Sequence, residues 1–327
     1  MSNGLTQLIS HNYGIDVTGI KLVSDQGEAK VYMLESPTGK YALKEFDDIF
    51  ELKHERDVCD MVAGKGVNLP KIYDAKSGRH IVHNNGLTYI LYDFIEGTRY
   101  ELNTAPEWFL MKQVQTLGQI QSALRDYKQL PMDFEPSFFS QEEYTKSEHS
   151  ALEKLRLAEE NEDKALVQAL NERLKHIRRI SAFEFDCGRL TYVNSHGDFY
   201  INQIIVRDGE FVVIDWSDPY YLPACYEVLM SYTYAAPECK GGVIDVERFK
   251  PVLREYLKYV TLSQYDIKMM PYLLYAFCVF GSFSPPYDDL SADHLRIAKH
   301  TANLANWLHD NVEKLSDDLC VTFCNHR

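Results

Sequence analysis

The amino-terminal stretch lacks the basic segment and apolar core that mark a secretory signal. A long apolar run is also missing. The longest uncharged run, Met269 to Tyr287, contains prolines and many aromatics, which favours a buried helix over a membrane span. Basic residues are outnumbered, with 34 Lys and Arg against 48 Asp and Glu and a net charge of −14. This balance disfavours nucleic acid and anionic membranes as partners, and it favours cationic ligands.

The seven cysteines are odd in number and scattered along the chain, which predicts reduced thiols in a cytoplasmic protein. Cys320, Cys324 and His326 have no second ligand pair at zinc-site spacing, so we expect no zinc site there. No internal repeat is evident. A length of 327 residues is enough for two domains or for one large two-lobed domain.

An ordered set of polar residues lies within residues 194–216. Asp198 sits in an Asn-Ser-His-Gly-Asp loop, and Asp215 follows the second of two apolar, β-branched runs. An Asp-Gly pair separates these runs, which is a strong hairpin signal. The start of the first strand, with Gln203, and the end of the second, with Asp215, are neighbours because a hairpin folds back on itself. We therefore expect these three side chains to meet at one end of the hairpin.

Two carboxylates and one carboxamide in this arrangement suit phosphoryl transfer. Asp198 can orient an acceptor hydroxyl and take its proton, and Asp215 can hold the magnesium ion that bridges the phosphates. The amide of Gln203 can support the metal, which prefers a few oxygen ligands. The alternative from these residues alone is a buried hairpin with two incidental aspartates.

The His-Gly-Asp motif at 196–198, followed by Ile-Asp-Trp at 214–216, resembles the aminoglycoside phosphotransferase family. That family also includes choline, homoserine and fructosamine kinases. The resemblance implies an α+β, two-lobed protein-kinase-like fold with an antiparallel-sheet N-lobe and a mostly helical C-lobe.

The lobes that the resemblance implies are residues 1–97 for the nucleotide-binding N-lobe and residues 98–327 for the C-lobe. The catalytic loop and hairpin, residues 194–216, would belong to the C-lobe. A charged helical pair at about residues 140–180 would be the family's variable insert, which often walls the acceptor site. Glu227 stands where the family often has an aspartate that braces the catalytic loop.

The family's usual loop has Asn five residues after the aspartate, where this chain has Gln203. We expect Gln203 to be the second metal ligand, and Asn202 to point to the opposite side if the strand has already begun at that position. His196 is expected to shape the loop by hydrogen bonding. The departure at Gln203 leaves a non-catalytic kinase-like binding or scaffold protein as the alternative.

Lys44 follows Tyr-Ala-Leu on an alternating strand, a context that resembles the Val-Ala-Ile-Lys of kinases. A lysine there pairs with the α- and β-phosphates. Glu55 lies on the apolar face of the next helix, together with Val58 and Val62. An inward glutamate needs a partner, and Lys44 is the available one. A solvated Lys44 and an exposed Glu55 are the alternatives.

Two further regions are expected to contact the nucleotide because of where they lie along the chain. Ser24 and Gly27, in the turn one hairpin before Lys44, would lie over the phosphates, where small residues let backbone N–H groups approach. The backbone of Asp93 and Ile95 would meet adenine in the hinge that the resemblance implies.

Together these features predict an ATP- or GTP-dependent, magnesium-dependent phosphotransferase that acts on a hydroxyl of a small molecule. The resemblance to the family implies an aminoglycoside-like molecule or another amino alcohol as the acceptor. A protein kinase is disfavoured because the chain lacks a Gly-x-Gly-x-x-Gly loop, His-Arg-Asp and Ala-Pro-Glu. The motifs leave the acceptor, the choice between ATP and GTP, and the oligomeric state open.

Overall fold

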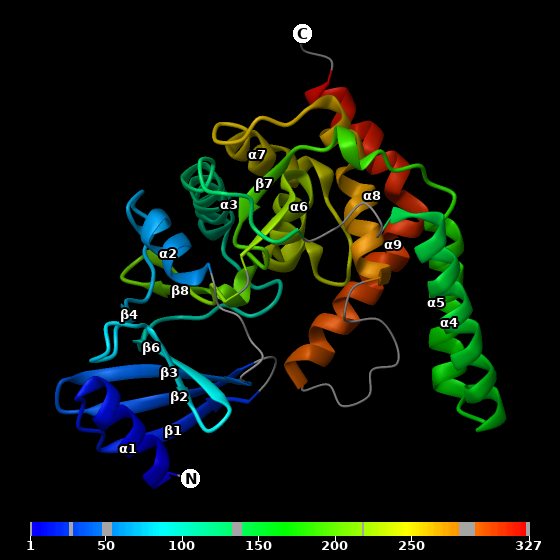
Figure 1. Ribbon diagram of the computed structural model, residues 1–327. Helices are drawn as coiled ribbons and strands as arrows, with labels where there is room; N and C mark the ends of the chain where they lie inside the picture. Colours follow the sequence, from blue (N-terminus) through cyan, green and yellow to red (C-terminus); the bar gives the residue numbers. More distant parts are fainter. Residues whose placement is uncertain are drawn as a thin grey trace. The chain divides into compact units, whose positions relative to one another are not determined.

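The computed structural model describes residues 2–25, 29–47, 54–132, 139–217, 219–280 and 292–324. The chain divides into two compact units, residues 1–99 with 203–218, and residues 100–202 with 219–327. Figure 1 shows their elements coloured along the sequence. Within the described segments, no helix is both long and apolar enough to span a membrane.

The first unit is built on an antiparallel sheet with strand order β1-β2-β3-β6-β4, and β5 also pairs with β6. An antiparallel sheet in this part of the chain agrees with the predicted fold class. Its elements are α1 (Ser2–Tyr13), β1 (Gly19–Ser24), β2 (Ala29–Ser36), β3 (Gly39–Asp47), α2 (Glu55–Ala63), β4 (Ile72–Tyr73), β5 (Ile81–Asn84), β6 (Leu87–Asp93), β8 (Ile204–Arg207) and β9 (Glu210–Val213).

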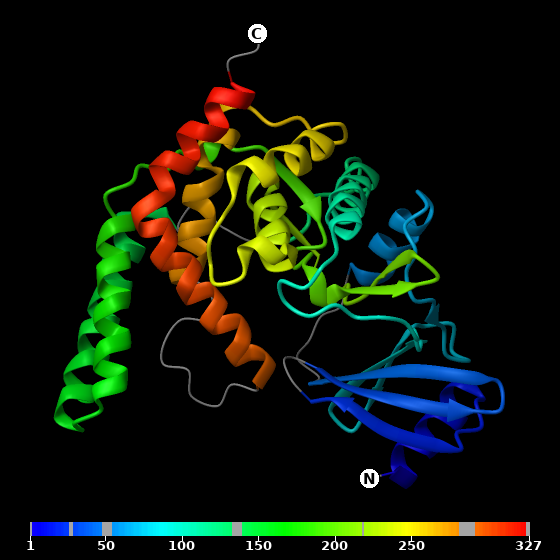
Figure 2. The same cartoon turned by 180° about the vertical axis from the view of Figure 1, so that it is seen from behind.

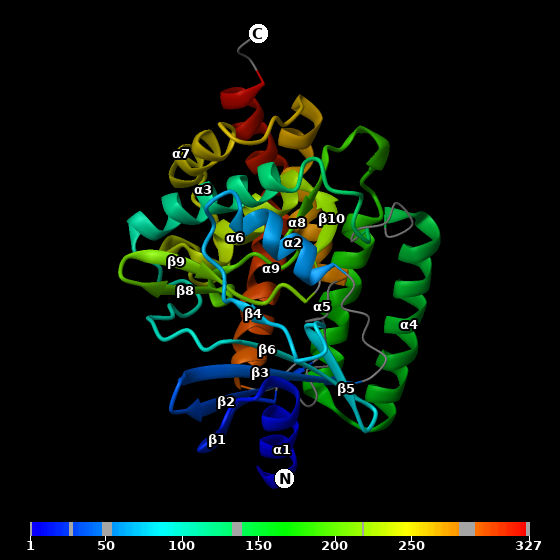
Figure 3. The same cartoon turned by 60° about the vertical axis from the view of Figure 1, so that its left-hand side comes forward.

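The two faces of the sheet carry different chemistry. Helix α1 runs along one face (Figure 3), where its Leu8 and Ile9 join Tyr41 and Leu43 of β3 in one apolar cluster. Side chains alternate along a strand, so Lys44 of β3 points to the opposite face. The apolar cluster thus fixes which way β3 faces, and with it the direction of Lys44.

The predicted hairpin forms as β8 and β9, joined by a turn at Asp208 (φ 53°) and Gly209 (φ 77°). Two positive φ values in a two-residue loop are typical of a type I′ turn, which suits the twist of a hairpin. The hairpin packs with the sheet unit: Thr98 and Val206 exchange two backbone hydrogen bonds of 2.8 Å, and Asn68 bonds to the backbone of β9. The expected boundary after residue 97 put this hairpin with the helical part, whereas these contacts group it with the sheet.

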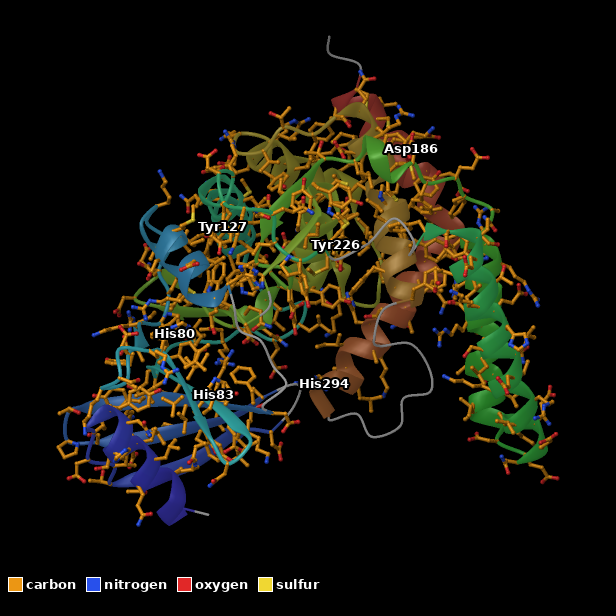
Figure 4. The ribbon with its side chains drawn as sticks, viewed as in Figure 1. His80, His83, Tyr127, Asp186, Tyr226 and His294 are labelled. Carbon is orange, nitrogen blue, oxygen red and sulfur yellow. The ribbon has the colours of Figure 1, made fainter. Side chains whose placement is uncertain are left out.

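The second unit is mostly helical, as predicted. Its elements are α3 (Glu107–Ala123), α4 (Gln141–Glu160), α5 (Lys164–Ile180), β7 (Tyr192–Ser195), β10 (Tyr220–Pro223), α6 (Ala224–Ala235), α7 (Val246–Tyr256), α8 (Gln264–Phe280) and α9 (Ala292–Phe323). Helix α6 is buried along its whole length and forms the centre of the unit. Tyr226 of α6, labelled in Figure 4, is 2% exposed.

The helical pair expected near residues 140–180 is present as α4 and α5. Ser140 caps α4 by accepting a 3.2 Å hydrogen bond from the backbone N–H of Glu143, as its capping-box sequence predicts. Figure 2 shows α8 and α9 side by side, with the α4–α5 hairpin beside them. His176 of α5 joins the three helices, because its ring hydrogen-bonds Tyr275 of α8 and Asn306 of α9.

Candidate active site

Lys44 and Asp215 are 171 residues apart in sequence and form an ion pair in the first unit. The Lys44 ammonium also donates a 3.0 Å hydrogen bond to the hydroxyl of Ser217, and that hydroxyl lies 3.3 Å from the Asp215 carboxylate. The rings of Phe46 and Tyr92 lie 5.9 and 5.7 Å from the ammonium, within cation–π range. The fold therefore brings one cation and one carboxylate together on the sheet face opposite α1.

Asp215 has a backbone conformation that is rare for a residue with a side chain. Its φ is +68°, in the left-handed region that costs such residues energy. Buried Trp216 fixes the segment by donating a 3.1 Å hydrogen bond to the carbonyl of Val213. The Asp215 side chain stays 45% exposed. A strained backbone that presents a carboxylate to solvent is typical of a functional position.

Glu55, at the start of α2, is fully buried on the same face. One of its carboxylate oxygens accepts a 2.7 Å hydrogen bond from Tyr92, and the other has no hydrogen-bond partner among the described residues. Burial raises the pKa of Glu55, whereas the charge of Lys44 and the Tyr92 hydroxyl each lower it. Lys44 thus acts on Glu55 through its charge, while its ammonium donates hydrogen bonds to Asp215 and Ser217.

Gln203 lies opposite the Asp215 segment, because its carbonyl accepts a 2.9 Å hydrogen bond from the backbone N–H of Ile214. The strand has not yet begun at Asn202. Ile201–Gln203 forms a short 3-10 helix, and β8 begins only at Ile204. Alternation along a strand therefore does not decide whether Asn202 or Gln203 faces Asp215, since the loop turns once more before it extends.

The loop that carries Asp198 follows β7 in the second unit. His196 is 1% exposed, its Nδ1 accepts a 3.4 Å hydrogen bond from the backbone N–H of Asp198, and its ring contacts Phe199 edge-on. Asp198 itself is exposed, between half-buried Gly197 and buried Phe199. The loop therefore has an apolar anchor and presents one carboxylate outward.

Glu227 of α6 stabilises this loop through hydrogen bonds. Its carboxylate accepts 3.1 and 2.9 Å hydrogen bonds from the Gly197 backbone and from Gln121. Gln121 also contacts Ser195, and its carbonyl accepts a 2.6 Å bond from Tyr256. Burial raises the pKa of Glu227 to about 7, although these donors oppose the shift.

Asn194 ties the start of the same loop to the end of α3. Its side-chain amide donates to three carbonyls, including that of Tyr127, which is labelled in Figure 4. Its side-chain oxygen accepts a 3.0 Å bond from the backbone of Leu130. Every hydrogen-bonding group of this amide is thus used, so Asn194 fixes the chain just before His196.

Where the structure describes them, the expected nucleotide contacts lie at or just beyond the ends of strands in the sheet unit. Ser24 ends β1, next to an irregularity in its pairing with β2, and Gly27 lies outside the described residues. Asp93 ends β6, where its backbone N–H donates to Lys71 and its carboxylate accepts a 2.7 Å bond from Tyr73. Ile95 follows two residues later, beyond the end of β6.

The family profile described as the phosphotransferase enzyme family, APH, matches residues 19–249. The chain belongs to this family. It is accordingly a small-molecule phosphotransferase, as the His-Gly-Asp and Ile-Asp-Trp motifs predicted. No curated protein sequence matches the chain.

Solved structures share the fold at low sequence identity. One is the amicoumacin kinase hAmiN in complex with AMP-PNP, Ca2+ and Ami (TM-score 0.63, 14% identity, 95% of this chain and 93% of that chain). A second is the microcompartment-associated aminopropanol kinase (TM-score 0.60, 15% identity, 97% and 99%). A third is choline kinase from Cryptosporidium parvum (TM-score 0.56, 12% identity, 98% and 97%). These likenesses show the kinase-like fold.

Several polar residues of this phosphotransferase were not found from the sequence. Ser217 contacts Lys44, and Tyr92 contacts Glu55. Gln121 bonds to Glu227, and Tyr256 bonds to Gln121. Ser217 could have been found from the sequence, because it lies two residues after Asp215. The other three sit among apolar residues of strands and helices, where their spacing is that of ordinary core positions.

Proposed function

We propose that this chain transfers the γ-phosphate of ATP to a hydroxyl of a small molecule with the help of Mg2+. The ion pair between Lys44 and Asp215 is the observation that carries this proposal. It sets a lysine beside an aspartate, the two residue types that bind the phosphates and the magnesium ion in phosphoryl transfer. Two complexes of similar fold, hAmiN with AMP-PNP and spectinomycin phosphotransferase with ADP, support an adenine nucleotide.

Hard oxygen donors suited to Mg2+ surround the proposed metal position. They are the exposed carboxylate of Asp215 and the hydroxyl of Ser217, and the side-chain amide of Gln203 would add a third, since its backbone is paired with Ile214 beside Asp215. Asp215 and Gln203 would hold the ion, with Ser217 orienting the carboxylate. A bound Mg2+ would neutralise charge on the phosphates. These donors fit the ion because none of them is a soft ligand.

The remaining residues are assigned by the chemistry they carry. Asp198 accepts the proton of the acceptor hydroxyl, and buried His196 holds the loop. Lys44 binds the α- and β-phosphates, with Glu55 as its second carboxylate partner. Ser24 and Gly27 cover the phosphates, and the backbone at Asp93 and Ile95 contacts adenine. The two-lobed division, with the sheet unit binding nucleotide, is part of this proposal.

The acceptor is proposed to be an amino alcohol or an aminoglycoside-like molecule. The names of proteins with a similar fold, aminopropanol kinase, choline kinase and spectinomycin phosphotransferase, support this class. The net charge of −14 favours a cationic molecule as well. The thermal unfolding experiment below also tests whether the protein prefers GTP to ATP.

Thermal unfolding with nucleotide and metal tests the proposal. A ligand that binds only the folded state stabilises it by about 2.7 kcal/mol at one hundred times its Kd. ATP with Mg2+ should raise Tm more than AMP or Mg2+ alone, and parallel GTP samples identify the preferred base. The absence of any shift with either triphosphate would favour the non-catalytic alternative, which the Gln at position 203 motivates.

A further inference from the structure

The helical unit contains a small cavity between α3, α6 and α7. Its volume is about 10 Å³. That is close to the space one water molecule requires, and no larger ligand fits. The wall consists mainly of leucine and valine side chains, but Gln113 of α3 and Ser231 of α6 also line it.

Gln113 places a buried donor at this cavity. The residue is 2% exposed, and its Nε2 has no hydrogen-bond partner among the described residues. An amide N–H that is removed from water and left unbonded is costly, so native proteins nearly always satisfy it. The position of Gln113 among Leu110, Val114 and Leu117 on the buried side of α3 gives the amide no route to solvent.

Ser231 places an acceptor at the same cavity. Its hydroxyl donates to the carbonyl of Phe199, the residue after Asp198 in the loop. A hydroxyl has one hydrogen and two lone pairs, so Ser231 can still accept a hydrogen bond. Ser231 therefore connects the cavity to the loop that carries Asp198.

We propose that the cavity holds one buried water molecule, which accepts a hydrogen bond from Gln113 Nε2 and donates one to Ser231 Oγ. A polar pocket of this size with two polar partners is the setting in which buried waters are found. Because the water donates a hydrogen bond to Ser231 Oγ, it favours the rotamer in which the Ser231 hydroxyl donates to the carbonyl of Phe199. This site is independent of the reaction that the protein catalyses.

A crystal structure of the full chain at high resolution tests the site directly. One ordered water should lie within about 2.7–3.2 Å of both Gln113 Nε2 and Ser231 Oγ. A cavity without density, or a Gln113 amide bonded to a protein atom instead, would overturn the proposal.

Two substitutions give a second test in solution. Val114→Ile extends a lining side chain by one methylene and displaces the water, which leaves Gln113 unsatisfied, so Tm should fall. In a Gln113→Met background the donor is gone, and the same Val114→Ile change should leave Tm unchanged or raise it. If Val114→Ile raises Tm in both backgrounds, the cavity is dry. If it lowers Tm equally in both, the cost does not come from an unsatisfied Gln113 amide. Either result contradicts the proposal.

Discussion

Lys44 lies close to two carboxylates in different surroundings. Asp215 is 45% exposed at its side chain, whereas Glu55 is fully buried. Burial raises the pKa of Glu55 despite the nearby ammonium, and Tyr92 donates a hydrogen bond to its carboxylate. When phosphates take up the ammonium, we expect Lys44 to leave Asp215 and to keep its interaction with Glu55.

That interaction predicts a coupled loss of function. Lys44→Ala should weaken ATP binding or turnover, and Glu55→Gln should reproduce part of the loss because the two residues act as a unit. A double-mutant cycle on kcat/KM for ATP should give a coupling energy of about 0.5–3 kcal/mol. Fully additive losses would show that Glu55 does not support Lys44.

Gln203 carries the prediction on the metal. Gln203→Ala should raise the Mg2+ concentration required for half-maximal turnover far more than Asn202→Ala, the matched neighbouring change. Gln203→Asn should be tolerated, because it keeps the amide on a shorter stem. A titration of rate against Mg2+ measures this. A larger effect of Asn202→Ala would move the metal ligand to Asn202, since the 3-10 helix at Ile201–Gln203 leaves both side chains as candidates.

Glu227 makes stability depend on pH. Its pKa is raised from 4.5 to about 7 in the folded protein, so between these values the folded state keeps a proton that the unfolded state releases. Stability from this group is therefore present below about pH 4.5 and is lost as pH rises to 7, by an amount on the order of 3 kcal/mol. Glu227→Gln does not titrate. The stability of the native protein relative to this variant should fall between pH 5 and 8, as measured by urea unfolding. A constant difference would contradict the burial argument.

At the scale of elements, the β8–β9 hairpin depends on a close approach at Gly97. A Cβ there would lie 2.5 Å from the carbonyl oxygen of Val206 and 2.6 Å from the side chain of Ile205. Those positions are held by the paired backbone bonds between Thr98 and Val206. The glycine after Glu96 therefore lets the segment leaving the sheet lie against the hairpin.

Gly97→Ala should consequently destabilise the fold by about 1–3 kcal/mol, as overpacking usually does. Gly4→Ala in α1 is the matched control, because its Cβ would meet nothing within 4 Å and alanine favours a helix. Urea unfolding of both variants measures the difference. Equal free energies of unfolding for the two variants would show that the segment at Gly97 and the hairpin can move apart without loss of stability.

The hairpin and the two helical regions could be predicted because their signals are local. Asp208-Gly209 between β-branched runs and the capping box at Ser140 depend on neighbouring residues only, and both appear as expected. The 3-10 helix at Ile201–Gln203 could not be predicted, because its sequence is also compatible with a strand. The packing of β8 against Thr98 depends on a contact between residues about one hundred positions apart, which no local pattern carries.

At the scale of the whole molecule, the proposed reaction divides its groups between the two units. Lys44, Glu55 and Asp215 belong to the sheet unit, and Asp198 with its brace at Glu227 belongs to the helical unit. The motif residues were visible in the sequence because their types and order resemble a known family. The brace of Gln121 and Tyr256 was not, because it depends on helices α3, α6 and α7 meeting in the core.

The central claim is that Asp198 accepts the proton of a small-molecule hydroxyl as ATP is cleaved. The most direct measurement is ADP release from ATP and Mg2+ over a panel of amino alcohols and aminoglycosides, with the native chain and Asp198→Asn side by side. With Asp198 as the base, we expect acceptor-dependent ADP release that falls by roughly 10²–10⁴-fold in the variant, while ATP with Mg2+ still raises the Tm of both proteins. Native turnover in Asp198→Asn would contradict it, as would a native chain that neither binds ATP nor releases ADP with any acceptor.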